Sequence, residues 1–99
     1  MVELDLTSEA RPELRVTGPA GEIAHPLSPR HAQVLSLLAL APGGRSAGEL
    51  SVDLFGDAGH TVAVRAEVSR LRRQLGGVLD HRPYRFADGV EVRVRGPLS

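Results

Sequence analysis

Alternating apolar and polar residues at the start of the chain predict short β-strands. The segment "ELDL" places its two leucines on one face of an extended chain, and "ELRV" does the same with Leu14 and Val16. After the turn-forming "GPAG", the segment "GEIAHPL" adds Ile23. We therefore expect two or three antiparallel strands within residues 2–27, with an apolar face that other elements must cover.

The apolar spacing then changes to that of helices, which we expect to occupy residues 28–77. Ser28 precedes a proline at the first helical position, and "RHAQVLSLLALA" is rich in helix formers until a Pro-Gly-Gly sequence ends it. A second, shorter helix opens with "SAGE", where Ser46 and Glu49 have the spacing of a capping box. Gly56 marks its expected end.

A third helix is expected to begin after Thr61, a candidate N-cap, and to end at the glycine pair 76–77. At 100° per residue, one stripe of this helix is apolar and consists of Val64, Val68, Leu71 and Leu75. The residues pointing away from that stripe are Val62, Ala66, Ser69 and Arg73, with Arg65 and Arg70 beside them. Arg72 borders the apolar stripe, where its stem can pack while its head stays in water.

Residues 78–95 return to the pattern of strands. Tyr84 and Phe86 share one face, and Val90, Val92 and Val94 form an alternating row. The intervening Asp-Gly is a strong signal for a two-residue hairpin turn. The predicted fold class is therefore α+β, with N-terminal strands, three helices and a C-terminal hairpin in one domain, residues 1–99.

Composition narrows the class of protein. The chain is 41% hydrophobic and 24% charged, which is typical of a globular domain, and it contains no cysteine that could form a disulfide or ligate a metal as thiolate. No apolar run approaches the ~20 residues of a membrane span, and the acidic start "MVELDL" does not resemble a signal peptide. We expect a cytoplasmic protein without a membrane partner.

Charge is segregated although the formal net charge is zero. Residues 1–28 hold five acids and two arginines, whereas residues 61–86 hold six arginines and two acids, a local net charge of +4. Such a basic segment favours a surface that faces a polyanion. A solvated face on a structural helix is the alternative, because charged helix faces are common.

At "VSRLRRQLGG" the chain resembles the winged helix-turn-helix DNA-binding domain of OmpR/PhoB-type response regulators and related actinobacterial regulators. In that family a valine-rich start and "SRLRRKLG" form the recognition helix, and a strand pair with a Gly-Tyr-Arg-Leu-like ending forms the wing. The segments "LSPRHAQVLSLL", "GELSVDLFG" and "PYRF" match the family's first helix, second helix and wing. The resemblance covers about residues 3–95.

The resemblance implies a set of DNA-contacting residues: Thr61, Arg65, Ala66, Ser69, Arg70, Arg72, Arg73, Arg82 and Arg85. Arg70 corresponds to the main reader of base edges, bidentate to a guanine. Arg65, Ala66 and Ser69 correspond to residues that face the major groove, and Arg72 and Arg73 to residues that hold phosphates. The two arginines of the wing correspond to contacts with the minor groove or the DNA backbone.

Three features depart from the family. An acid and a histidine usually stand where this chain has Arg65 and Glu67, so a base preference is not transferred. The wing "VLDHRPYRF" is shorter than usual. The loop "FGDAGHTV" lies where some relatives contact RNA polymerase, and no residue in it specifies that contact.

The expected function is therefore sequence-specific binding of double-stranded DNA, as the output domain and C-terminal part of a longer bacterial transcription regulator with a sensor domain. RNA polymerase and a second copy on tandem half-sites are expected partners. The alternative function is a winged-helix protein-interaction module whose arginine face docks an acidic partner. The four histidines are scattered along the chain, so we expect no metal site. The sequence has neither a P-loop nor an ordered Ser/His/Asp motif, so we expect neither an enzyme nor a cofactor.

Overall fold

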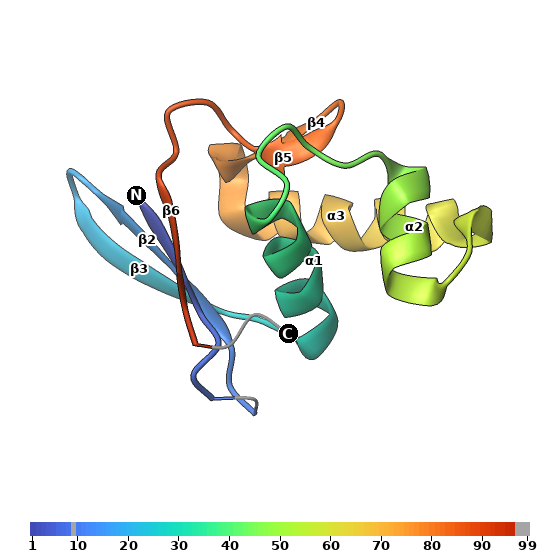
Figure 1. Ribbon diagram of the computed structural model, residues 1–99. Helices are drawn as coiled ribbons and strands as arrows, with labels where there is room; N and C mark the ends of the chain where they lie inside the picture. The colour runs from blue at the N-terminus through green and yellow to red at the C-terminus, as the bar shows by residue number, and fades with distance from the viewer. Residues whose placement is uncertain (9, 97–99) are drawn as a thin grey trace.

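A four-stranded sheet lies beside three α-helices, and a separate two-stranded hairpin lies above the third helix, near the end of the first (Figure 1). The computed structural model describes residues 1–8 and 10–96, and this part of the chain has an α+β fold. Its elements are β1 (Val2–Asp5), β2 (Glu13–Gly18), β3 (Gly21–Pro26), α1 (Pro29–Ala39), α2 (Ala47–Phe55), the 3₁₀ turn η1 (Ala58–His60), α3 (Thr61–Leu75), the 3₁₀ turn η2 (Gly76–Val78), β4 (Leu79–His81), β5 (Tyr84–Phe86) and β6 (Val92–Arg95).

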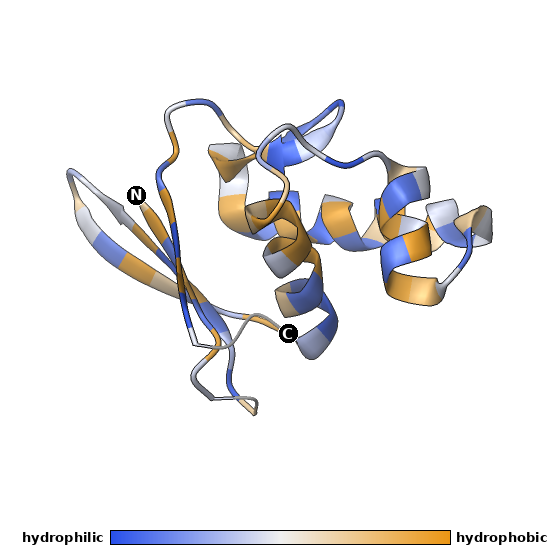
Figure 2. Ribbon diagram, viewed as in Figure 1, coloured by the Kyte–Doolittle hydropathy of each residue, from blue (hydrophilic) through white to orange (hydrophobic). Residues whose placement is uncertain are grey.

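The sheet has the strand order β3-β2-β1-β6. The three N-terminal strands are antiparallel, as the alternation predicted, and β6 pairs parallel to β1. Val2 lies opposite Val16 on one side and Val92 on the other, so a valine row crosses the sheet on the face that packs against the helices. The hydropathy colouring of Figure 2 shows the alternation of apolar and polar residues along these strands.

The expected hairpin at Asp88-Gly89 is wrong. β5 pairs instead with β4, through a tight turn at residues 82–83. β6 pairs with β1 and belongs to the four-stranded sheet. Asp88-Gly89 still forms a turn, since Val90 N donates to Ala87 O at 3.1 Å, but this turn redirects the chain from the hairpin to the sheet. Pairing with β1 lets Val92 and Val94 pack against the main core, and that packing determines the partner of β6.

Ile23 also departs from the expectation that it would lie on a covered face, because 63% of it is exposed. Its strand, β3, is the outer edge of the sheet, and residues 21–24 of this strand are exposed (Figure 1). Leu4 and Leu14, on the two strands nearer the centre, are fully buried. The helical layer therefore covers the middle of the sheet and leaves this edge exposed.

α1 is the central helix of the core, with Val34, Leu35 and Leu38 fully or almost fully buried. Ser28 caps it as predicted, its hydroxyl accepting a hydrogen bond from His31 N at 3.1 Å. The helix ends at Ala39, before the Pro-Gly-Gly sequence.

The predicted capping box of α2 is confirmed: Glu49 N donates to the Ser46 hydroxyl at 3.1 Å, and Ser46 N donates to the Glu49 carboxylate at 3.0 Å. Gly56 ends this helix in the left-handed conformation, with φ of 84°. Both ends of α2 were therefore encoded by local residues.

Thr61 is not the N-cap of α3, because it is already the first helical residue. The chain enters α3 through η1, where a buried serine of α2 replaces the missing cap. The Ser51 hydroxyl accepts from His60 N at 3.0 Å and donates to Asp57 O at 2.6 Å. Packing of α2 against η1 thus sets the start of α3, which a purely local pattern did not reveal.

Candidate nucleic-acid interface

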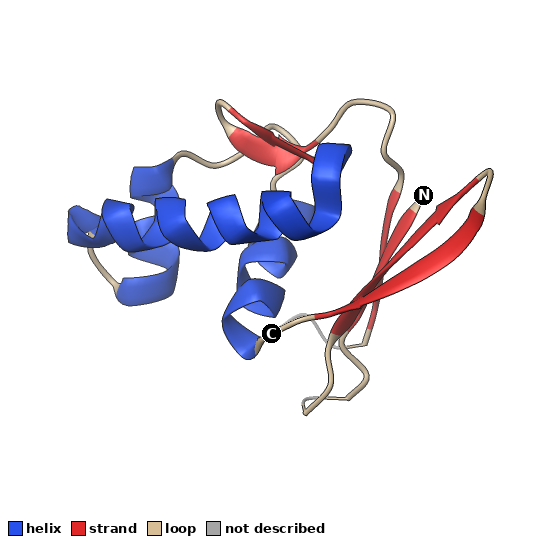
Figure 3. Ribbon diagram, turned by 180° about the vertical axis from the view of Figure 1, so that it is seen from behind, coloured by secondary structure: helices blue, strands red, loops and turns tan. Residues whose placement is uncertain are grey.

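Four apolar residues fix the orientation of α3 in the domain. The residues of the predicted stripe are all buried, with at most 7% of any one exposed: Val64, Val68, Leu71 and Leu75. Burial of one side of the helix leaves the opposite side toward water. Seen from behind in Figure 3, α3 runs across the front of the molecule, and the β4–β5 hairpin lies above it.

The outward side of α3 carries arginines without internal partners. Arg65, Ser69 and Arg73 are exposed at successive i, i+4 positions, and Ala66 beside them is partly buried. Across residues 1–8 and 10–96, no group forms an ion pair or hydrogen bond with the guanidinium of Arg65 or Arg73. These two positive charges are therefore available to an anionic ligand.

Arg70 has a different environment, because a carboxylate holds it. Its Nη2 lies 2.8 Å from Oε1 of Glu67, and the arginine side chain is 55% exposed. The other carboxylate oxygen of Glu67 lies 2.6 Å from Nε2 of His31 on α1. Burial alone would raise the pKa of Glu67, but hydrogen bonds from Arg70 and His31 outweigh burial and lower that pKa below its ordinary value.

Arg72 and Gln74 connect α3 to its neighbours. Arg72 is partly buried, and its Nε donates to Leu79 O of β4 at 3.3 Å. Nε2 of Gln74 donates to Pro26 O, at the end of β3, at 3.0 Å. One N–H group of Arg72 thus connects α3 to β4, and its remaining N–H groups can bind a ligand.

The two arginines of the β4–β5 hairpin also differ from each other. Arg82 is exposed at the turn, and within the described part of the chain it has no ion-pair partner. Arg85 is 25% exposed, lies 3.6 Å from Asp80 and forms an ion pair with Asp88. Arg82 therefore offers a free charge, whereas the charge of Arg85 is already compensated.

The hairpin is attached to the connection between α1 and α2. Arg45 N donates to Tyr84 O at 2.8 Å, and Tyr84 N donates to Arg45 O at 3.0 Å. The side chain of Arg45 is bound to Asp53 at 2.7 Å and to Glu49 at 3.1 Å, both on α2. The helices thus hold the hairpin in a defined place next to α3.

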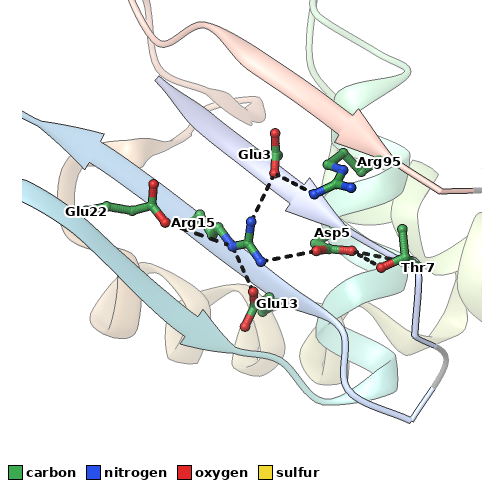
Figure 4. A network of polar contacts seen from close by, with 7 residues as sticks. All are labelled: Glu3, Asp5, Thr7, Glu13, Arg15, Glu22 and Arg95. Carbon is green, nitrogen blue, oxygen red and sulfur yellow. Dashed lines mark hydrogen bonds and ion pairs between the residues drawn. The ribbon is translucent and has the colours of Figure 1, made fainter.

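The arginines on the outer face of the sheet are paired with acids. Arg15 lies within ion-pair distance of several acids, including Glu13 at 2.8 Å and Asp5 at 3.4 Å (Figure 4). Glu3 is shared between Arg15 at 3.5 Å and Arg95 at 3.9 Å. A hydrogen bond from the Thr7 hydroxyl, chiefly, lowers the pKa of Asp5. Positive charges on this face are neutralised within the molecule.

The structure brings most of the sequence-predicted residues to one side. Arg65, Ala66, Ser69, Arg70 and Arg73 lie on the outward half of α3. Thr61, at the start of the helix, is partly buried.

Sequence reasoning missed two residues of this region. His31 comes from α1, so its contact with Glu67 depends on helix packing that no local spacing reports. Val62 was placed on the outward side but not counted as functional, and it is 78% exposed, the largest exposed fraction among the big apolar residues of the described chain.

A hollow of about 370 Å³ lies between the end of α1 and the segment after β5, lined mainly by apolar residues such as Leu38, Pro42, Phe86 and Val90. Its charged residues, Arg85 and Asp88, pair with each other. The described residues contain no group of three acidic or histidine side chains arranged to hold a metal ion. No helix among them has the length and apolar character needed to cross a bilayer.

Comparison with known proteins gives one informative similarity. A 62-residue segment is 46% identical to an uncharacterized 47.3 kDa protein from the thcA 5' region of Rhodococcus erythropolis. That match covers 62% of this chain but only 14% of the relative. No family model and no solved structure matches the chain.

Proposed function

We propose that this chain is a winged-helix domain that binds double-stranded DNA in a sequence-specific manner, as the output domain of a bacterial transcription regulator. The observation that carries the proposal is the outward face of α3, where Arg65 and Arg73 have no partner among the described residues. Arginines on the outer face of the sheet, by contrast, are paired with acids. The difference makes α3 the surface that a polyanion would select.

The shape of this surface suits the major groove of DNA, which admits one α-helix. In the proposed complex α3 enters the groove with Ser69 and Arg70 toward base edges and Arg73 toward a phosphate. Arg72 would add a phosphate contact through the N–H groups that Leu79 O does not occupy.

The β4–β5 hairpin is proposed to be the wing. It lies above α3 in Figure 3, and its turn presents Arg82 to solvent. Arg85 was expected to share that role, but its pairing with Asp80 and Asp88 makes it the weaker candidate. Arg82 is therefore the residue of the hairpin that we expect to contact the DNA backbone or the minor groove.

The protein is proposed to act as part of a larger regulator. The matched segment is only 14% of the relative's length, which supports further domains in the relative, and we extend this arrangement to the present protein. One domain offers few phosphate contacts, so useful affinity requires two copies on tandem or symmetric half-sites.

The proposal is tested by measuring DNA affinity against salt concentration. Four arginines are proposed to contact phosphates: Arg65, Arg73 and Arg82, which have no ion-pair partner among the described residues, and Arg72. With about 0.9 counterions released per phosphate contact, four contacts give a log–log slope near −3.6, or roughly a 150-fold rise in Kd from 50 to 200 mM salt. Arg73→Ala should reduce the slope to about −2.7, or a rise of roughly 40-fold.

Arg93→Ala is the matched control, because it removes one positive charge from the outer face of the sheet. Arg93 is 63% exposed and pairs only with Glu91 among the described residues. Its slope should equal that of the parent. Equal slopes for the parent and Arg73→Ala, or a flat slope for the parent, would refute DNA binding through α3.

One observation favours a protein partner as the second candidate function. Val62 stands on the same outward side of α3 as the arginines, and 78% of it is exposed. An apolar residue among cations suits an acidic, partly hydrophobic protein surface as well as a groove of DNA. Binding to an acidic protein with no affinity for duplex DNA would support this alternative.

A further inference from the structure

The side chain of Arg70 is linked to the interior of the domain through two other residues. Nη2 of Arg70 bonds to one oxygen of Glu67 at 2.8 Å, and the second oxygen of Glu67 meets Nε2 of His31 at 2.6 Å. Exposure falls along this series, from 55% for Arg70 to 24% for Glu67 and 14% for His31. We call these three residues the Arg70 chain.

The inner end of the Arg70 chain is rigidly held. His31 lies in the first turn of α1, where its own backbone N–H donates to the Ser28 hydroxyl. Its neighbours Ala32 and Leu35 are buried in the core. The packing of α1 therefore sets the position of the imidazole. Through its contact with Nε2 of His31, the carboxylate of Glu67 is held in place as well.

Among the described residues, no other acid competes with Glu67 for Arg70 or His31. On α2 the carboxylates of Glu49 and Asp53 are engaged by Arg45, and Asp57 lies 3.5 Å from His60. In the part of the chain that the structure describes, Glu67 forms ion pairs with Arg70 and His31 and with no other residue.

A fixed carboxylate beside an arginine has a specific consequence for recognition. An arginine that reads guanine must present two coplanar N–H groups to O6 and N7, and its many rotamers make that geometry entropically costly. The contact with Glu67 uses one N–H of Nη2, which leaves other N–H groups of the planar fork free. Arg65 and Arg73, which have no such support, suit phosphates, where any orientation serves.

The same carboxylate carries a cost for affinity. Glu67 lies on the helix that would face phosphates, so its negative charge repels DNA of every sequence. If Glu67 only neutralised the charge of Arg70, its effect would be to weaken DNA binding. If Glu67 orients Arg70, it would favour the base pair that Arg70 reads over other base pairs.

We propose that Glu67 and His31 are positioning residues that orient Arg70 for base reading, exchanging overall affinity for sequence discrimination. This inference rests on the proposed DNA-binding function.

The experiment first defines a site by in vitro selection of the parent domain from a randomised duplex pool. Selection with Arg70→Ala then identifies the base pair at which preference is lost. The readout is the ratio of Kd values for the selected site and for the same site changed at that base pair. For the parent we expect a ratio on the order of 5- to 150-fold, the range of one bidentate arginine contact.

Glu67→Gln should lower this ratio at least about threefold while tightening binding to the changed site, because it removes both the orientation and the repulsion. His31→Ala should also lower the ratio. His31→Gln, which keeps a hydrogen-bond donor, should restore much of it. Gln74→Ala is the control, because Gln74 lies on the same flank and bonds to Pro26 O rather than to the Arg70 chain.

The outcomes distinguish failure of the positioning role from failure of the proposed DNA binding. If Glu67→Gln keeps the parental ratio while Arg70→Ala loses it, Arg70 reads without help and the positioning role is refuted. If Arg70→Ala loses preference at no base pair, the positioning role is refuted while DNA binding stands. If the parent enriches no sequence and does not bind duplex DNA, the proposed function fails as well. Circular dichroism of each variant verifies its fold, and the two His31 variants provide a second route if Glu67→Gln unfolds.

Discussion

Replacing Gly44 with alanine tests whether the β4–β5 hairpin is seated on the connection between α1 and α2. Gly44 has φ of 98°, a conformation that an alanine adopts only with strain. An added Cβ would overlap the ring of Pro83 and stand 3.1 Å from Tyr84 O. The substitution therefore combines a backbone cost with a collision against the hairpin.

Gly56→Ala supplies the backbone cost alone. Gly56 has φ of 84°, close to that of Gly44, but nothing lies within 4 Å of the position where its Cβ would stand. A left-handed alanine costs about 1–2 kcal/mol of unfolding free energy. Overpacking adds about 1–3 kcal/mol, so we expect a total of about 2–5 kcal/mol for Gly44→Ala.

The assay is urea unfolding of the parent and the two variants, followed by circular dichroism. The midpoint should fall further for Gly44→Ala than for Gly56→Ala, by an amount equivalent to about 1–3 kcal/mol. Equal losses in the two variants would show that the hairpin does not rest on Gly44, and the placement of the β4–β5 hairpin on the connection between α1 and α2 would lose its support.

Three further predictions follow from individual contacts. Ser46→Ala removes the hydroxyl that caps α2 and should lower the unfolding free energy by about 1 kcal/mol in the same urea assay, and an unchanged midpoint would contradict the capping box. A backbone hydrogen bond from Ser46, chiefly, and the charge of Arg45 lower the pKa of Glu49 below 4.5, so its contribution to stability is present above that pH and is lost as the pH falls through the lower folded value. Glu49→Gln should therefore be less stable than the parent at pH 7, and the gap should narrow as the pH falls below 4.5; a gap of constant size would contradict a stabilising role for the Glu49 charge. If α3 binds DNA as proposed, the exposed Val62 would contact a thymine methyl group, so replacing thymine by uracil in the bound site should weaken the parent about threefold or more and leave Val62→Ala unaffected. Equal weakening of both would assign the methyl contact to another residue.

Local features of the fold were predictable because the residues that determine them are neighbours in sequence. Ser46 and Glu49 encode the start of α2 across one turn, and the spacing of Val64, Val68 and Leu71 encodes the buried side of α3. The arginines on the opposite side of that helix followed from the same periodicity.

Features that depend on distant contacts were missed or assigned wrongly. β6 pairs with β1 from the other end of the chain, and the Asp88-Gly89 signal describes a turn without saying which strands it joins. The start of α3 depends on Ser51 of α2 rather than on Thr61. His31 reaches Glu67 only because α1 packs against α3, so the most specific part of the candidate site required the tertiary structure.

Nuclear magnetic resonance of the labelled domain during titration with duplex DNA tests the central proposal most directly, because the Nε–H signals of individual arginines report which face is bound. DNA binding through α3 and the hairpin should shift the signals of Arg65, Arg70, Arg73 and Arg82, and leave those of Arg15 and Arg93 on the sheet in place. Shifts concentrated on the two sheet arginines, or no change on α3 at saturating DNA, would contradict the proposed interface.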